Sequence, residues 1–196
     1  MVRLASAMQV FAAALVCTSC ASQHQPFPSN WAAPARGSGD HCPEISGVYR
    51  NEGETPDGKV ANRLMSRWFQ NAYDLPLPIE SWKHVSKVSI LQTGNDLIQI
   101  SGLSSSAVLF STSLSKSAGD FHCADGWVKV KGSNLVAVSS AFMKTKETRG
   151  FSKAGAYLVE MIEAESFGMM LIVPVGGSGT YWFRYAEISP QHELVQ

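Results

Sequence analysis

Trp127-Val128-Lys129-Val130-Lys131 alternates apolar and charged side chains, the period expected of a strand with one buried face. Other short apolar segments, rich in β-branched and aromatic residues, flank it on both sides. They cover residues 45–51, 85–93, 97–100, 107–110, 135–138, 155–163, 167–173 and 180–188. Short strands at near-regular spacing favour an up-and-down antiparallel meander. We therefore predict a mainly β domain that curls into a half-barrel or closes into a barrel.

One segment breaks this pattern and predicts a helix. Its apolar side chains recur at helical spacing between residues 59 and 72, namely Val60, Leu64, Met65, Trp68 and Phe69. We expect this amphipathic helix to cover the mouth of the sheet. Glycine-containing or polar segments predict turns at 93–96, 132–134, 165–166 and 176–179, and an exposed loop at 144–153.

The first nineteen residues have the pattern of a secretory signal. A charge at Arg3 precedes an apolar run at 10–16, and the small residues Thr18 and Ser19 lead to Cys20. The run is shorter than the roughly 20 residues that a membrane-spanning helix needs. The sequence therefore predicts export.

The approach to Cys20 resembles the lipobox of bacterial lipoproteins, although Cys17 stands where a lipobox usually carries Leu. The resemblance implies cleavage before Cys20, a diacylglyceryl group on its sulfur and an acyl chain such as palmitate on its new amine. Three chains are enough to hold the protein stably on a membrane. Ala21, in place of Asp, implies an outer-membrane lipoprotein facing the periplasm. The alternative is ordinary cleavage near Ser19 or Ala21, which would release a protein without lipid.

The rest of the chain divides into a tether, a domain and a tail. Residues 20–41 are rich in Pro, Ser, Ala and Gly and predict a flexible tether in which Phe27 and Trp31 stay mobile. Residues 42–190 predict a single β-rich domain, followed by a tail at 191–196. The chain carries 16 basic and 16 acidic residues with no basic run, so the electrostatic requirement for nucleic-acid binding is missing.

Four cysteines lead to one predicted disulfide. If Cys17 leaves with the signal and Cys20 carries lipid, Cys42 and Cys123 remain, and two thiols in an exported domain usually pair. His41 and His122 precede these cysteines, so the bond would bring both imidazoles into one neighbourhood. They are weak candidate ligands for a metal; histidines flanking a structural disulfide are the simpler interpretation.

Two resemblances bear on the domain. Cys42-Pro43-Glu44-Ile45-Ser46-Gly47-Val48-Tyr49, with Cys123-Ala124-Asp125-Gly126 later, resembles a family of proteobacterial lipoproteins and implies no known activity. A fainter likeness is to lipocalins, in which an Arg of the last strand packs over a Trp of a Gly-x-Trp motif on the first. Gly47-Val48-Tyr49 and Arg184 take the comparable positions here, which implies a lipocalin-like sheet.

Catalytic motifs are missing from the sequence. It has no Gly-x-Ser-x-Gly or His-Glu-x-x-His, its Cys-x-x-Cys at 17–20 falls in the predicted signal and lipobox, and Glu160 and Glu163 should lie on opposite faces of a strand. We therefore predict a protein that is not an enzyme and needs no cofactor: a lipid-anchored binding or structural module with an envelope protein as possible partner. The alternatives are an inhibitor or immunity protein against a cell-wall hydrolase, and a carrier of a small apolar ligand.

Overall fold

The computed structural model describes residues 20–34, 41–65, 81–105, 107–138, 141–170 and 173–188. The predicted signal peptide at 1–19, the tail at 191–196 and most of the predicted helix lie outside these residues. The described elements are β1 (Cys20–His24), β2 (Gly47–Arg50), β3 (Glu52–Glu54), β4 (Val60–Leu64), the 3₁₀ helix η1 (Ser81–His84), β5 (Lys87–Thr93), β6 (Leu97–Leu103), β7 (Val108–Ser115), β8 (Phe121–Ala124), β9 (Trp127–Val138), β10 (Ala141–Ala154), β11 (Tyr157–Met170) and β12 (Val173–Ala186).

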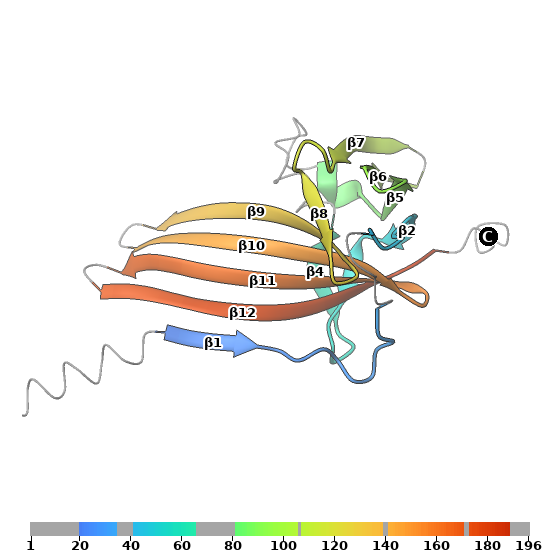
Figure 1. The fold of residues 1–196 in the computed structure, drawn as a ribbon. Coiled ribbons are helices and arrows are strands. Elements are labelled where there is room, and N and C mark those ends of the chain that lie inside the picture. The colour runs from blue at the N-terminus through green and yellow to red at the C-terminus, as the bar shows by residue number, and fades with distance from the viewer. Residues whose placement is uncertain are drawn as a thin grey trace, which may run out of the picture. The chain divides into compact units, whose positions relative to one another are not determined.

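The strands form two sheets, and the prediction of a mainly β, antiparallel fold is confirmed. The larger sheet has the order β4-β3-β12-β11-β10-β9-β8, and β1 also pairs with β12 (Figure 1). The smaller sheet has the order β2-β5-β6-β7. Strands β8 to β12 and β5 to β7 are meanders, in which each strand lies beside the next one along the chain. Both sheets are open, so the described strands do not close into a barrel.

The chain has two compact parts, which we describe separately. The hairpin part contains the described residues up to Pro26 together with Gly132–Thr148 and Ile162–Tyr181. The core part contains Phe27–Lys131, Arg149–Met161 and the described residues from Trp182 onward. Each of the long strands β9 to β12 contributes residues to both parts.

Several segments expected to be turns or loops are strands. β9 continues through 132–134, β11 through 165–166 and β12 through 176–179, while β10 occupies the predicted loop at 144–153. The glycines with positive φ are Gly58, Gly94, Gly119, Gly126 and Gly155. The glycines in the mispredicted turns therefore do not adopt the left-handed backbone that makes glycine a turn residue.

The start of the predicted helix is also wrong. Residues Val60–Leu64 form strand β4, which pairs with β3 in the register Gly53↔Ala61 and Glu54↔Val60. A tight turn between them places the Thr55 amide 2.9 Å from the Lys59 carbonyl oxygen. The backbone bonds of this hairpin replace the helical bonds that the apolar spacing predicted.

The main hydrophobic cluster of the core part lies between the two sheets. Tyr49, Val88, Ile98 and Leu114 contribute from the smaller sheet, and from the larger sheet come Phe121, Val128, Val130, Phe151, Leu158 and Tyr185. In β9, Val128 and Val130 are buried while Lys131 is exposed, as the alternating sequence predicts. The period of two thus fixes which face of the sheet builds this cluster.

A second cluster covers the opposite face of the larger sheet within the core part. Trp31 packs there with Ala154, Val159, Met161 and Trp182, and Phe27 and Trp127 lie against them. Trp31 is only 7% exposed, and the Phe27 ring is 5.1 Å edge-on from that of Trp182. These two aromatic residues, expected to be mobile in a tether, are packed.

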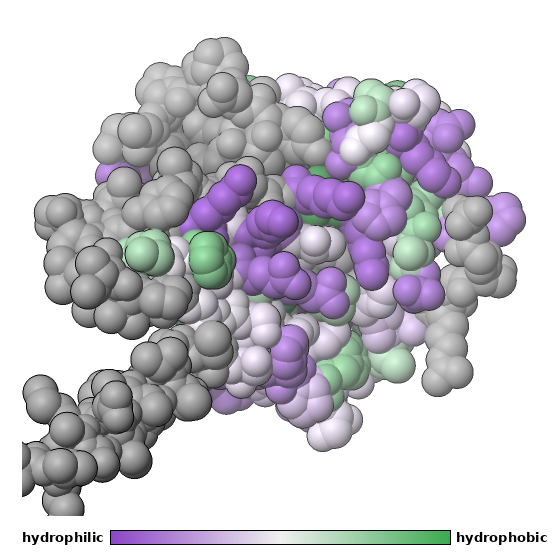
Figure 2. All heavy atoms as spheres, turned by 60° about the vertical axis from the view of Figure 1, so that its left-hand side comes forward, coloured by the Kyte–Doolittle hydropathy of each residue, from purple (hydrophilic) through white to green (hydrophobic). Residues whose placement is uncertain are grey.

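Large exposed hydrophobic side chains are scattered rather than gathered over most of the described surface. Hydrophobic residues form small groups among hydrophilic ones on the face that Figure 2 draws. The described residues include no helix that is long and apolar enough to cross a bilayer.

Candidate functional site

The segment that begins at Cys20 is a strand of the hairpin part. β1 lies parallel to β12 in the register Cys20↔Gly176, Ala21↔Gly177, Ser22↔Ser178, Gln23↔Gly179 and His24↔Thr180. The ladder ends with the Gln25 amide, which donates to the Thr180 carbonyl oxygen at 3.2 Å. The backbone of the predicted lipidation residue therefore has a defined place in the sheet.

Side chains on one face of this pair add a polar network. The ring nitrogens of His24 lie 3.0 Å from the Thr180 hydroxyl oxygen and 3.3 Å from that of Ser178. The Ser178 hydroxyl also lies 3.4 Å from that of Ser22. Because all four side chains are at least partly exposed, we expect these bonds to fix the register of β1 more than to add stability.

A shallow groove of about 210 Å³ lies on the hairpin part beside β1. Its lining residues are Gln23, Ala164, Ser166, Gly177, Ser178, Gly179 and Tyr181. The Ser166 hydroxyl is 3.1 Å from that of Thr145 on the neighbouring strand. The lining offers hydroxyl and amide groups but no carboxylate, imidazole or thiol, so it suits a small neutral polar group.

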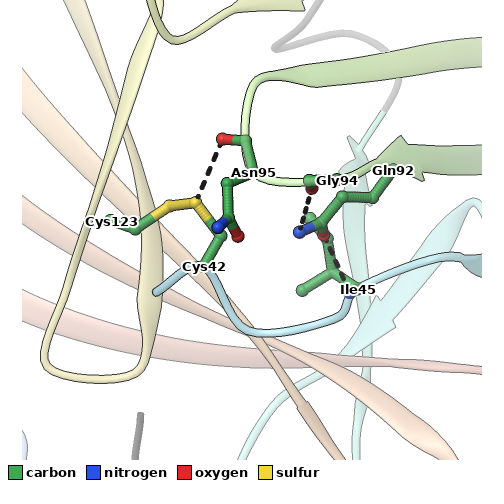
Figure 3. Close-up of a disulfide and its surroundings, with 6 residues drawn as sticks. All are labelled: Cys42, Ile45, Gln92, Gly94, Asn95 and Cys123. Carbon is green, nitrogen blue, oxygen red and sulfur yellow. Dashed lines mark hydrogen bonds between the residues drawn. A yellow bond between two sulfur atoms is a disulfide. The ribbon is translucent and has the colours of Figure 1, made fainter. Parts of the chain in front are cut away.

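The predicted disulfide is present in the core part. Cys42 and Cys123, 81 positions apart in sequence, are bonded with their Cα atoms at 5.0 Å (Figure 3). Nearby, the Gln92 side chain accepts a bond from the Ile45 amide at 3.1 Å and donates to the Gly94 carbonyl at 3.3 Å. The disulfide joins the first residues of the domain to β8, and the side-chain amide of Gln92 joins them to the β5–β6 hairpin.

The two histidines that flank the disulfide lie on the surface of the core part. His41 and His122 are exposed, and the described residues contain no cluster of three or more His, Cys, Asp or Glu side chains that would hold an ion. His122 is opposite Lys129 in the β8–β9 ladder. Desolvation, with the positive charges of Lys131 and Lys129, lowers the pKa of His122 below its usual value.

A buried polar cluster on β10, β11 and β12 was not found from the sequence. Arg149 donates to Glu160 at 2.6 Å, and the Tyr185 hydroxyl donates to the other oxygen of the same carboxylate, also at 2.6 Å. The three residues are 4%, 0% and 0% exposed. Glu163 is exposed, so the two glutamates lie on opposite faces as predicted. The sequence feature that could have predicted this cluster is Glu160, a carboxylate inside the apolar run 158–162.

Arg184 has partners other than the one the lipocalin likeness implies. Its guanidinium lies 4.4 Å from the ring centre of Tyr157 and 5.1 Å from that of Trp31, and its Nε donates to Glu54 at 2.9 Å. Tyr49 instead belongs to the main cluster, where its hydroxyl donates to the Ile45 carbonyl at 2.9 Å. The expected packing of Arg184 over Tyr49 is therefore wrong.

No protein-family model, no curated protein and no solved structure matches this chain. The likeness to lipoproteins therefore rests on the sequence alone, on the residues before Cys20 and those around Cys42 and Cys123.

Proposed function

We propose that this chain is a lipid-anchored lipoprotein of the bacterial envelope, held in the outer membrane and facing the periplasm. Its β-rich domain acts as a non-enzymatic binding or structural module for an envelope protein. Cys20 carries the lipid, and Cys42 and Cys123 keep the exported domain closed in an oxidising compartment.

The observation that supports this proposal most strongly is that Cys20 lies in β1 and pairs with Gly176 of β12. Cleavage before Cys20 would keep every pair between β1 and β12 that the structure describes. An anchor at Cys20 is thus joined directly to a sheet of the folded domain. Residues 1–19 supply the signal that such an anchor requires.

The arrangement of polar groups favours a non-enzymatic module. The Glu160 carboxylate is buried against Arg149 and Tyr185, where substrate has no access. The groove beside β1 offers hydroxyl and amide groups alone. Such groups hold a partner or a ligand by hydrogen bonds.

The test is mass spectrometry of the protein expressed with its own signal and extracted from membranes. We expect a chain that begins at Cys20, carries acyl chains and has lost two hydrogens to one disulfide. A chain without acyl groups would refute the proposal. Pull-down with the extracted lipoprotein then tests for the envelope partner, and turnover of a panel of cell-wall substrates would contradict the non-enzymatic role.

A matched pair of variants separates the anchor from general damage to the signal. Cys20→Ser should abolish acylation and release the protein from the outer-membrane fraction. Cys17→Leu changes the neighbouring cysteine and restores the usual lipobox residue, so acylation should be retained. If Cys17→Leu loses acylation and Cys20→Ser keeps it, the lipid is not on Cys20.

A further inference from the structure

The hairpin part exposes two large apolar side chains on one strand. Phe167 is 66% exposed and Met169 is 41% exposed, and both lie on β11. Because they are two residues apart, they project from the same face of the sheet. Gly168 between them is buried, which agrees with this alternation. An exposed Phe beside an exposed Met is a feature of surfaces that another apolar phase covers.

This pair lies beside the predicted anchor. A Cβ built on Gly176 would stand 3.9 Å from both the Cα and a ring carbon of Phe167. Gly176 is in turn the ladder partner of Cys20. Cys20, Gly176 and Phe167 are therefore neighbours across β1, β12 and β11, so the exposed ring lies near the residue at which the chain would be anchored.

Few charged residues border this pair. Residues 166–170 of β11 and 173–183 of β12 contain no Asp, Glu, Lys or Arg, and the exposed Lys144 and Glu165 precede or flank Phe167 on β10 and β11. A small apolar face bordered by charged side chains suits the boundary between lipid headgroups and acyl chains, because the charged groups can stay at the headgroups.

We propose that the Phe167–Met169 face enters the interface of the membrane that holds the Cys20 lipid, so that anchor and sheet bind one bilayer together. The inference rests on the proposed lipidation of Cys20 and deepens it. The lipid supplies affinity, and the two side chains fix the orientation of the hairpin part against the bilayer. The charged side chains at the border of this face stay at the headgroups, which avoids the cost of burying charge in lipid.

The experiment places a fluorophore that responds to polarity on the acylated protein. A cysteine introduced by Phe167→Cys or Met169→Cys is the one free thiol, since Cys20 is acylated and Cys42 is bonded to Cys123. Leu91→Cys and Val108→Cys provide matched controls on exposed apolar residues, 55% and 63% exposed, of β5 and β7. Each labelled protein is reconstituted in vesicles of phosphatidylethanolamine and phosphatidylglycerol, with and without brominated acyl chains.

We expect labels at 167 and 169 to shift to the blue and to be quenched by brominated lipid, and labels at 91 and 108 to stay in water. If the labels at all four sites report the same contact with water, in protein whose mass shows the acyl chains, the inference is overturned and the proposed function stays intact. A blue shift without vesicles that grows with protein concentration would assign the face to a second copy of the chain and would also overturn it.

A second measurement uses a form of the protein that cannot be acylated but keeps the Phe167–Met169 face. The chain from residue 20 onward, with Cys20→Ser, is sedimented with the same vesicles, and Phe167→Ser with Met169→Ser should weaken its binding about 10-fold or more. The pair Leu91→Ser with Val108→Ser should leave binding unchanged. Equal binding by both pairs would overturn the inference. Because this form carries no lipid, its result does not depend on the proposed acylation.

Discussion

Replacing Glu160 by Gln should destabilise the domain more than any other single change of similar size in β11. The carboxylate accepts hydrogen bonds of 2.6 Å from both Arg149 and Tyr185, in a site where none of the three is more than 4% exposed. Glu160→Gln keeps the shape of the side chain and removes its charge. The buried guanidinium of Arg149 then loses the negative charge of Glu160 beside it.

The expected loss follows from what burial does to an uncompensated charge. Breaking a buried ion pair by removing one partner typically costs about 3–5 kcal/mol. A domain of this size is stable by roughly 5–15 kcal/mol, so the variant loses a large share of its free energy of unfolding. With a urea slope of about 2 kcal/mol/M, the unfolding midpoint should fall by about 1.5–2.5 M. Equilibrium unfolding in urea with the disulfide intact measures this shift.

Glu163→Gln is the matched control, because it makes the same chemical change three residues further along β11 at an exposed position. Its free energy of unfolding should change by no more than about 0.5 kcal/mol, the range of ordinary surface substitutions. The double variant Arg149→Met with Glu160→Leu should lose less than the sum of its single changes, since it removes both charges. A loss below about 1 kcal/mol in Glu160→Gln would refute the reasoning and show that the site does not depend on the charge of Glu160.

Three further predictions concern the core part. Replacing Cys42 and Cys123 by Ser opens a link between residues 81 positions apart, so the free energy of unfolding should fall by roughly 4–5 kcal/mol in the chain-entropy model, and an unchanged urea midpoint would contradict this. Burial, followed by the charges of Glu187 and Glu44, raises the pKa of Tyr49. Its contribution to stability is therefore complete below the ordinary tyrosine pKa near 10 and is lost as the pH rises above it, so Tyr49→Phe should flatten the alkaline fall of the urea midpoint. Desolvation and two lysines lower the pKa of His122, so its ring should titrate below its ordinary value in an NMR titration, and Lys129→Gln should raise that pKa; an unchanged titration would contradict the arrangement.

The parts of the fold that sequence predicts are those where one face of a strand is buried. Val128 and Val130 are buried and Lys131 is exposed, because alternation alone decides which side of a strand meets the core. The antiparallel order and the pairing of Cys42 with Cys123 followed from spacing and from the count of cysteines. These features depend on local pattern, which a sequence displays.

The parts that sequence did not predict depend on neighbours that are distant in the chain. Gly176 and Gly177 are typical of a turn, yet they lie in a strand because β1 pairs with them from more than 150 residues away. The polar residues at 144–153 were expected to form a loop, but Arg149 is buried because Glu160 provides its counter-charge. In both places a partner outside the local window outweighs local propensity.

The same long-range pairing links the site of anchoring to the integrity of the sheet. β12 pairs with β3 at Arg184 and with β1 along Gly176–Thr180, so β1 covers a stretch of backbone that would otherwise be an open strand edge. An open edge exposes unpaired amide and carbonyl groups, to which another strand can add. β1 then forms the edge of the hairpin part along this stretch. If Cys20 is acylated as proposed, the anchor lies in this edge strand, so the membrane fastens the strand that covers β12.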